Sequence, residues 1–264
     1  MNEAAQGASD PIISITDLHK SFGPHSILKG VDLDIPRGEV TVIIGRSGEG
    51  KSVLLKHIIG LLTPDSGDVL LEGTSMCWSP PRVRRRLLRR FGMLFQNGAL
   101  FDSMTVFDNV AFPIREARLG LRKGELRDRV LEKLALVGLS DIDKKIPAEL
   151  SGGQRKRVAL ARAIALDPEI ILYDEPTTGL DPVRVHAVDE MILHAAHTLN
   201  VTSIVISHDM QAVFEIADRV AMLFDGKIHV CVTPAELRVH PSEVVQSFIA
   251  GRPMSDASAG QLTG

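Results

Sequence analysis

The stretch VTVIIGRSGEGKS, residues 40–52, decides the fold. It begins with a continuous apolar run, which is typical of a strand buried on both faces of a sheet. The residues GRSGEGKS at 45–52 fit the pattern G-x-x-x-x-G-K-[ST], whose glycines let backbone N–H groups converge on phosphate oxygens. The run SVLLKHIIGLL at 52–62 then predicts a helix, and a helix N-terminus attracts anions. The order of strand, loop and helix therefore predicts a phosphate-binding loop.

The side chains of this loop indicate the kind of phosphate that it binds. Lys51 is placed to reach the β- and γ-phosphates of a nucleotide, and the hydroxyl of Ser52 is placed to hold Mg²⁺. We expect nucleotide contacts from each position of the loop and from the residue that follows it: Gly45, Arg46, Ser47, Gly48, Glu49, Gly50, Lys51, Ser52 and Val53.

A pair of carboxylates follows a second apolar strand, in EIILYDEP at 169–176. Asp174 ends the strand, where its carboxylate can reach a Mg²⁺ ion at the carboxyl edge of the sheet. Glu175 comes directly after it and is placed to orient or deprotonate an attacking water. The chain is therefore expected to hydrolyse the nucleotide that it binds.

The composition excludes several other classes of protein. Of 264 residues, 44% are hydrophobic and 24% charged, as in ordinary globular proteins, and the formal net charge of −3 argues against a general nucleic-acid binder. No apolar run approaches the roughly 20 residues of a membrane span, and the first ten residues lack the features of a signal peptide. Cys77 and Cys231 fit no metal spacing, so we expect reduced thiols in a cytosolic protein.

Strand and helix patterns alternate along most of the chain, which favours a mainly parallel α/β sheet. We expect further strands at 12–18, 67–73 and 203–208, a helix at 209–217 and a hairpin at 219–232. Residues 97–165 interrupt the alternation, because they show almost only helical patterns. We therefore expect one domain at 11–251, with a helical subdomain at about 97–165 and short disordered tails at 1–10 and 252–264.

The segment LSGGQRKRVALARAIALDPEIILYDEPTTGLDP at 150–182 resembles the ABC-transporter ATPases, of which LSGGQ is the signature. The resemblance covers roughly residues 12–250. It implies an α/β P-loop NTPase fold of the ABC type, with a RecA-like core, an antiparallel β subdomain and an inserted α-helical subdomain. It also implies that the nucleotide is ATP and that Mg²⁺ accompanies it.

The same resemblance implies roles for four positions outside the loop. Phe22 matches the aromatic residue that stacks on adenine, although core packing would also explain it. Gln96 matches the glutamine that touches the Mg²⁺ and water site and reports to the membrane partner. Asp181 matches an aspartate at the dimer interface, and His208 matches the switch histidine near the γ-phosphate.

The signature itself has a physical rationale. Ser151 precedes the helical run GQRKRVALARAIAL, so its hydroxyl, the following glycine amides and the helix dipole form a second anion site. One chain cannot plausibly bring two such helix ends to the same γ-phosphate. The resemblance implies that a head-to-tail homodimer does so, with Ser151, Gly152, Gly153 and Gln154 acting on the ATP of the other subunit.

Five of the nine phenylalanines fall between residues 91 and 112. We expect Phe91 and Phe95, which lie on a strand, to belong to the core. The family resemblance places the docking site for a permease's cytoplasmic coupling helix after Gln96. Phe101, Phe107 and Phe112 are therefore expected to line a surface groove, with inward packing as the alternative.

The segment MLFQNGALFDSMTVFDNVAFPIRE at 93–116 is similar to the ATPases of the Mla/Mce lipid-transport systems. Gln154 and the residues TTGLDP follow the general ABC pattern instead. The subgroup implies an MlaE-like permease and an Mce-domain protein as partners and allows a small STAS-domain regulator. It also implies a peripheral position on the cytoplasmic face of the inner membrane.

Three other functions stay open at this point. They are the ATPase of a solute importer, a soluble ABC ATPase without a transport role, and a module that only holds ATP. Glu175 and His208 argue against the last of these, because both catalytic positions are filled.

The run RVRRRLLRR at 82–90 contains six arginines in nine residues. It lacks the interleaved aromatic residues of a nucleic-acid site. A solvated helix explains it, and so does a face near anionic lipid headgroups or an acidic partner.

Overall fold

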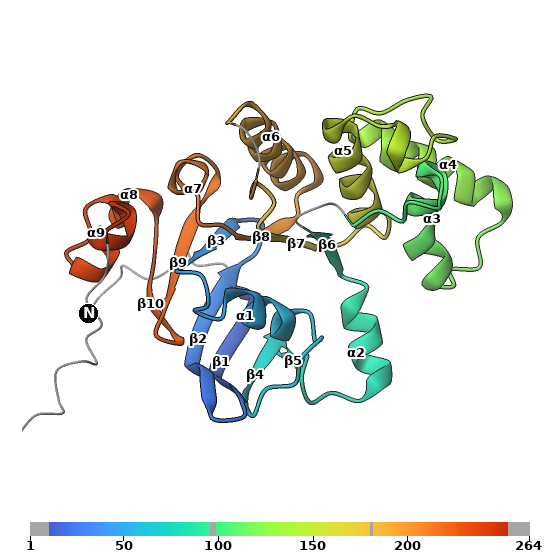
Figure 1. Cartoon of the computed structure of the whole chain (residues 1–264). Coiled ribbons are helices and arrows are strands. Elements are labelled where there is room, and N and C mark those ends of the chain that lie inside the picture. The colour runs from blue at the N-terminus through green and yellow to red at the C-terminus, as the bar shows by residue number, and fades with distance from the viewer. Residues whose placement is uncertain (1–10, 96–98, 180–181, 253–264) are drawn as a thin grey trace, which may run out of the picture.

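The computed structural model describes residues 11–95, 99–179 and 182–252 (Figure 1). The tails expected at 1–10 and 252–264 lie outside these residues, apart from Arg252. Gln96 and Asp181 also lie outside them.

Six strands form the central sheet of the molecule. They are β3 (Val40–Ile44), β6 (Phe91–Phe95), β7 (Ile170–Asp174), β8 (Thr202–Ile206), β9 (Arg219–Phe224) and β10 (Lys227–Val232). Their order across the sheet is β10-β9-β3-β8-β7-β6, and only β10 pairs in the antiparallel sense. The predicted mainly parallel sheet and the hairpin at its edge are confirmed. Because parallel strands end at one edge, the segments after β3, β7 and β8 come together there.

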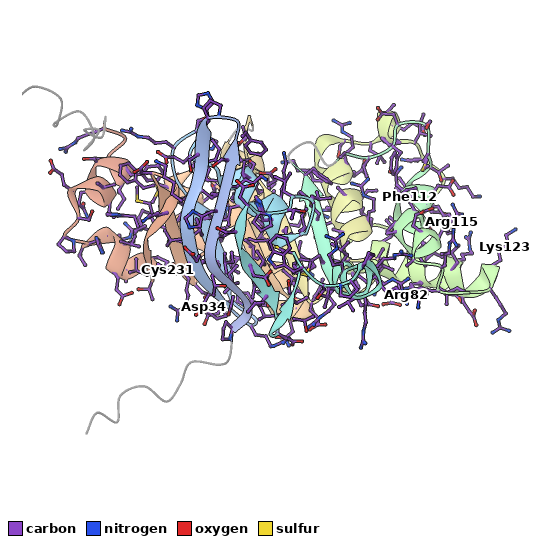
Figure 2. All side chains as sticks on the ribbon, turned by 90° about the horizontal axis from the view of Figure 1, so that it is seen from below. Asp34, Arg82, Phe112, Arg115, Lys123 and Cys231 are labelled. Atoms are coloured by element: carbon purple, nitrogen blue, oxygen red, sulfur yellow. The ribbon has the colours of Figure 1, made fainter. Side chains whose placement is uncertain are left out.

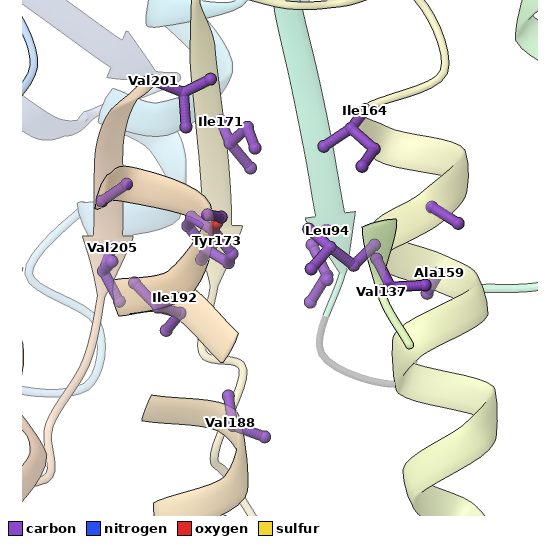
Figure 3. Close-up of a cluster of buried hydrophobic side chains, with 14 of the residues drawn as sticks. Leu94, Val137, Ala159, Ile164, Ile171, Tyr173, Val188, Ile192, Val201 and Val205 are labelled. Carbon is purple, nitrogen blue, oxygen red and sulfur yellow. The ribbon is translucent and has the colours of Figure 1, made fainter. Parts of the chain in front are cut away.

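Successive side chains of the central strands enter two separate cores. In β7, Ile171 and Tyr173 belong to one buried cluster, whereas Ile170 and Leu172 belong to the other. This alternation explains why the strand is apolar throughout, since both faces of the sheet are covered. Figure 3 shows part of the first cluster, where Ile171 and Tyr173 lie near Val205 of β8 and Ile192 of a covering helix.

A second, antiparallel sheet covers one side of the central sheet. It consists of β1 (Pro11–Phe22), β2 (His25–Pro36), β4 (Ser66–Leu71) and β5 (Thr74–Ser75), in the order β2-β1-β4-β5. Helix α1 (Lys51–Ile58) shares one hydrophobic cluster with β1, β2, β4 and the central strands. This arrangement is the antiparallel subdomain that the family resemblance implies.

The described residues between 99 and 165 form helices and their connections. These helices are α3 (Val106–Glu116), α4 (Lys123–Leu136), the short 3₁₀ helix η1 (Pro147–Glu149) and α5 (Gly152–Ala163). They lie at one end of the molecule, beyond β6 (Figure 1). Thr105 starts α3 by accepting a hydrogen bond from the backbone N–H of Asp108 at 3.1 Å. The expected fold class, a RecA-like core with an antiparallel sheet and an inserted helical part, is confirmed.

The remaining helices connect or cover these parts. They are α2 (Pro81–Leu88), α6 (Pro182–Leu199), α7 (Met210–Ile216), α8 (Pro234–Arg238) and α9 (Glu243–Ile249). No helix in the described part of the chain combines the length and the apolar character that a membrane crossing needs.

Candidate functional site

The loop between β3 and α1 takes a shape that glycine makes possible. Gly45 and Gly50 have φ angles of 155° and 100°. A Cβ atom on Gly45 would lie 2.5 Å from the backbone oxygen of Leu223, and one on Gly50 would lie 2.7 Å from Cγ2 of Ile27. Both contacts are closer than real Cβ atoms allow. The two fixed glycines of the motif are therefore required by the packing of the loop, as well as by access for a phosphate.

Lys51 begins α1 and is almost fully buried, with 5% of the residue exposed. Its ammonium group donates hydrogen bonds to the backbone oxygens of Gly45 and Arg46, each at 2.8 Å. Burial lowers the pKa of this ammonium, and the nearby carboxylates of Glu175, Glu49 and Asp174 oppose that effect. The lysine is thus held inside the loop, where a nucleotide phosphate would replace carbonyl partners by a stronger anionic one.

Ser52 and Asp174 meet across the edge of the sheet. The hydroxyl of Ser52 lies 3.5 Å from Oδ1 of Asp174, although 122 residues separate them in the sequence. Burial and the neighbouring carboxylate of Glu175 raise the pKa of the Asp174 carboxyl. A divalent cation would relieve both effects. Mg²⁺ commonly binds one or two protein oxygens together with nucleotide phosphates, so this pair fits such an ion.

Glu175 follows β7 in a left-handed conformation, with φ of 46°. Such a backbone costs free energy for a residue other than glycine. Its N–H donates to the backbone oxygen of Ile206 at 3.2 Å, and the hydroxyl of Thr178 donates to its Oε2 at 3.0 Å. Nδ1 of His208, which follows β8, lies 3.9 Å from the same oxygen. The backbone of Glu175 is therefore tied to the end of β8, and one carboxylate oxygen is fixed by Thr178 of its own loop.

Some of these groups share one cavity of about 450 Å³, whereas Ser52 and Asp174 are not among its lining residues. Gly45, Arg46, Ser47, Lys51, Glu175 and His208 line it, as the motifs led us to expect. The remaining lining residues are Met210, Phe248, Gly251 and Arg252, which the motif analysis missed. The last three lie at the end of α9, more than 190 residues from the loop, and no local sequence signal marks them as neighbours of a phosphate site.

Ser151 is the N-cap of α5. Its hydroxyl accepts a hydrogen bond from the N–H of Gln154 at 3.2 Å, and the amide oxygen of Gln154 accepts one from the N–H of Ser151 at 3.0 Å. The residues from Ser151 to Gln154 are not among those that line the cavity. Within one chain, the signature helix end and the phosphate loop are thus separate.

The structure does not bring three other expected site residues, Phe22, Gln96 and Asp181, into this cavity or does not describe them. Phe22 ends β1 with 47% of its side chain exposed, which excludes full core burial, and the ammonium of Lys20 lies 5.5 Å from its ring. It does not line the cavity. Gln96 and Asp181 lie outside the described residues, so their expected roles stay predictions.

A second cavity, of about 410 Å³, lies between β6, α3 and α5, and we call it the phenylalanine hollow. Phe91, Phe95, Phe101 and Phe112 line it, together with Arg162. The rings of Phe101 and Phe112 are 4.9 Å apart, and the guanidinium of Arg162 lies 5.8 Å from the ring of Phe101. Nη1 of Arg162 also donates to the backbone oxygen of Ala99 at 2.7 Å, which fixes the floor of the hollow.

The structure corrects two expectations about the phenylalanines. Phe95 was expected in the core, but it is 40% exposed, because its side chain points from the last position of β6 into the hollow. Phe107 was expected in the groove, but it is not among the lining residues and packs against the main hydrophobic cluster. It lies one helical turn from Ala111 and Val110, which are fully buried.

A glycine-rich loop that positions a lysine, a serine–aspartate pair and an oriented glutamate define the class of this protein as a P-loop nucleotide hydrolase. The separate serine-capped helix end narrows that class. The family model described as "ABC transporter" matches residues 28–178, which is more than half of the chain. The chain belongs to the ABC transporter family, and its domain is an ATP-binding ATPase domain of that family.

The chain is similar to known proteins over most of its length. It is 45% identical to "Probable ribonucleotide transport ATP-binding protein mkl" of Mycobacterium leprae, over 91% of this chain and 69% of that one. It is 42% identical to "Intermembrane phospholipid transport system ATP-binding protein MlaF" of Haemophilus influenzae, over 91% and 90%. A solved dimer of the ATP-binding cassette MJ0796, bound to ADP and Pi, matches with a TM-score of 0.73 and 30% identity, over 84% and 98% of the two chains.

Proposed function

We propose that this chain is the ATP-hydrolysing subunit of a transporter that moves phospholipids between bacterial membranes. The observation that carries the proposal is the match to MlaF, which covers about nine tenths of both chains. The proposed partners are an MlaE-like permease and an Mce-domain protein, and a small STAS-domain regulator is compatible with the same assignment. The proposed location is peripheral, on the cytoplasmic face of the inner membrane.

Transport of a ribonucleotide is the second candidate, because the mkl relatives carry that name at slightly higher identity. This chain spans 69% and 67% of the two mkl relatives but 90% and 89% of the MlaF relatives. The match to MlaF thus covers more of the relative's own length, and this coverage favours the phospholipid assignment. We place the domain at 11–251, with a helical subdomain at about 97–165.

For the chemistry, we assign nucleotide binding to the phosphate loop and hydrolysis to Glu175. Lys51 would hold the β- and γ-phosphates, and Ser52 and Asp174 would hold Mg²⁺, which neutralises phosphate charge when it is bound. Glu175 would orient the attacking water and accept its proton, because the Thr178 hydroxyl already fixes one carboxylate oxygen. His208 would contact the γ-phosphate from the same cavity. Gln96 and Phe22 keep their proposed roles beside the Mg²⁺ and the adenine.

The active form is proposed to be a head-to-tail homodimer. Ser151 and the glycines after it form a capped helix end that lies apart from the cavity of their own chain. In the dimer, that helix end would meet the γ-phosphate bound by the other subunit, and Asp181 would lie at the interface. The dimeric form of the MJ0796 cassette supports this arrangement by similarity.

The phenylalanine hollow is the proposed docking site for the permease. It joins the helical part to β6, and β6 runs directly into the segment that contains Gln96. Movement of that segment on ATP binding would thus reach a docked helix. Apolar area provides the affinity, since each fully covered phenylalanine contributes roughly 1.5–3 kcal/mol.

The experiment is purification of the intact complex from its native membrane through a tag on this chain, followed by mass spectrometry of its proteins and extracted small molecules. The proposal predicts a permease, an Mce-domain protein and enriched phospholipid. Recovery of a permease with bound ribonucleotide and no enriched phospholipid would support the second candidate. A chain that purifies alone from gently solubilised membranes would argue for the soluble ATPase class.

A further inference from the structure

Helix α2 (Pro81–Leu88) and its C-cap residue, Arg89, carry a stripe of arginines. Arg82, Arg85, Arg86 and Arg89 have the spacing i, i+3, i+4 and i+7, which places them on one side of a helix. All four are exposed. The helix contains no acidic residue. The stripe is therefore a positive surface without internal compensation.

Few of these charges are neutralised by other parts of the protein. Glu72 and Glu169 pair with Arg90, at 2.7 and 2.6 Å, but Arg90 lies beyond the stripe. Within the described residues, no carboxylate lies at ion-pair distance from Arg82, Arg85 or Arg86.

Part of this arrangement is unfavourable for the helix itself, although Arg85 and Arg86 lie in its last turn, where the helix dipole favours positive charge. Arginines at spacings of three and four repel one another, and Arg82 lies in the first turn, where the helix dipole is positive. A helix that only faces water would gain from mixed charges at these positions. The stripe thus has a physical reason to exist if an anionic surface meets it.

Exposed apolar side chains border the stripe. Arg84, Arg85 and Leu88 line a shallow hollow of about 230 Å³ together with Gly60, Met76 and Pro81. Leu88 is 39% exposed, and three residues close in sequence to the lining residues, Leu61, Trp78 and Val83, are 65%, 57% and 37% exposed. Positive charge and exposed apolar groups therefore occur on the same segments of the chain.

We propose that α2 and the hollow beside it attach the protein to the anionic headgroups of a phospholipid bilayer. Guanidinium groups bind phosphate through paired hydrogen bonds, and tryptophan favours the boundary between headgroups and acyl chains. An acidic protein segment would satisfy the arginines but would leave Leu61 and Trp78 without an apolar phase to enter. A bilayer surface offers both the charge and the apolar phase.

The position of α2 supports the same occupant. Nη2 of Arg89 donates to the backbone oxygen of Ala117 at 2.8 Å, which ties α2 to the end of α3. Phe91 comes two residues after Arg89 and lines the phenylalanine hollow. In Figure 2, Arg82 lies at the same end of the molecule as Phe112 and Arg115 of α3. If a permease docks at the phenylalanine hollow, a step that rests on the proposed function, the docking brings the surface of α2 towards the membrane.

The test uses the full chain and vesicles of phosphatidylcholine with or without phosphatidylglycerol. Binding is measured by co-sedimentation and by the fluorescence of Trp78, which is the one tryptophan of the chain. We expect binding and a blue shift only with phosphatidylglycerol, and loss of both at high salt, where the screening length falls to about 3 Å. The triple variant Arg82→Gln, Arg85→Gln and Arg86→Gln should bind about 10²-fold more weakly, since each basic residue near such a surface contributes roughly fivefold.

Two controls separate this effect from net charge and from folding. The variant Lys144→Gln with Lys145→Gln removes exposed charges from another surface and should bind as the unchanged chain does. Replacement of the same three arginines by lysine should retain most of the binding. ATP hydrolysis in solution should be unchanged in all three variants.

Equal binding to both kinds of vesicle, or undiminished binding by the glutamine variant, would overturn the proposal. So would a result in which the unchanged chain binds neither kind of vesicle while the glutamine variant loses the permease, because that result assigns α2 to an acidic protein segment. Failure of the proposed function has a different readout, namely the identity of the molecules that copurify with the complex.

Discussion

Nδ1 of His208 lies 3.9 Å from Oε2 of Glu175, although the two residues follow different strands of the central sheet. The distance is too long for a hydrogen bond. The same carboxylate oxygen already accepts the hydroxyl of Thr178 at 3.0 Å. Oε2 of Glu175 is thus held by Thr178 of its own loop and lies beside His208, and both Glu175 and His208 line the cavity in which a γ-phosphate would be bound.

Glu175→Gln should lower ATP turnover by about 10² or more, which is the usual scale for losing a positioned base. ATP affinity should stay near normal, because Lys51, Ser52 and Asp174 remain. Steady-state hydrolysis and equilibrium binding of a fluorescent ATP analogue measure the two effects. Lys51→Ala is the matched control, since it should weaken binding itself. Near-normal turnover by the glutamine variant would refute the assignment.

Sites completed between two subunits predict recovery on mixing. Ser151→Arg and Lys51→Ala chains should each be inactive alone, but a mixed dimer contains one site with both halves intact. Random pairing should restore about a quarter of wild-type activity, because half the dimers are mixed and one of their two sites is complete. Thermal melting of each variant checks that it folds, since Ser151 also caps α5. No recovery at any mixing ratio would indicate a self-sufficient monomer.

Serine substitutions of the phenylalanines should have two different effects. Phe101→Ser with Phe112→Ser should leave the melting temperature nearly unchanged and weaken permease binding by a few kcal/mol, because both rings line the hollow. Phe107→Ser should destabilise the fold instead, because Phe107 packs against the main core. Melting curves and permease pull-downs distinguish the two. A large drop in the melting temperature of the Phe101→Ser, Phe112→Ser variant would show that these two residues belong to the core.

A buried carboxylate on α6 should make the fold more stable in mild acid. Asp189 is 2% exposed, and neither of its oxygens has a hydrogen-bond partner within the described residues. Burial first, and then the charges of Glu215 and Asp209, raise the pKa of its carboxyl to about 6, and His186 opposes them.

The direction of the pH dependence follows from the raised pKa of the Asp189 carboxyl. An unfolded aspartate loses its proton near pH 4, so the free energy of unfolding falls between about pH 4 and pH 6 and stays lower above that range. Asp189→Asn should remove this fall and increase the free energy of unfolding at pH 7 by about 1–3 kcal/mol. Urea titrations at pH 5 and pH 7 measure the difference. An equal or lower stability of the variant at pH 7 would show that the carboxylate has a compensating partner.

The sequence predicts the placement of the loop after β3 and of the ends of β7 and β8, because each is a local pattern. Gly45, Lys51 and Glu175 take their places from the strand that precedes or the helix that follows them. The contribution of Phe248 and Arg252 to the cavity could not be predicted, since it depends on how α8 and α9 fold back after β10.

The phenylalanines show the same limit at the level of single side chains. Composition indicates that they cluster, but the side of a strand or helix that each occupies depends on register. Phe95 falls at the last position of β6, where the covering layer ends. Phe107 falls in the first turn of α3, where its N–H donates to the backbone oxygen of Asp143 and the helix turns its ring towards the core.

The most direct test of the central claim is lipid movement by the reconstituted complex. Proteoliposomes that contain this chain, its permease and its Mce-domain partner should transfer a fluorescent phospholipid to or from acceptor vesicles only when ATP and Mg²⁺ are present. The Glu175→Gln complex should bind ATP and abolish that transfer. Transfer at the same rate with the glutamine variant or without ATP would contradict the account, because hydrolysis by this subunit would then not drive the lipid.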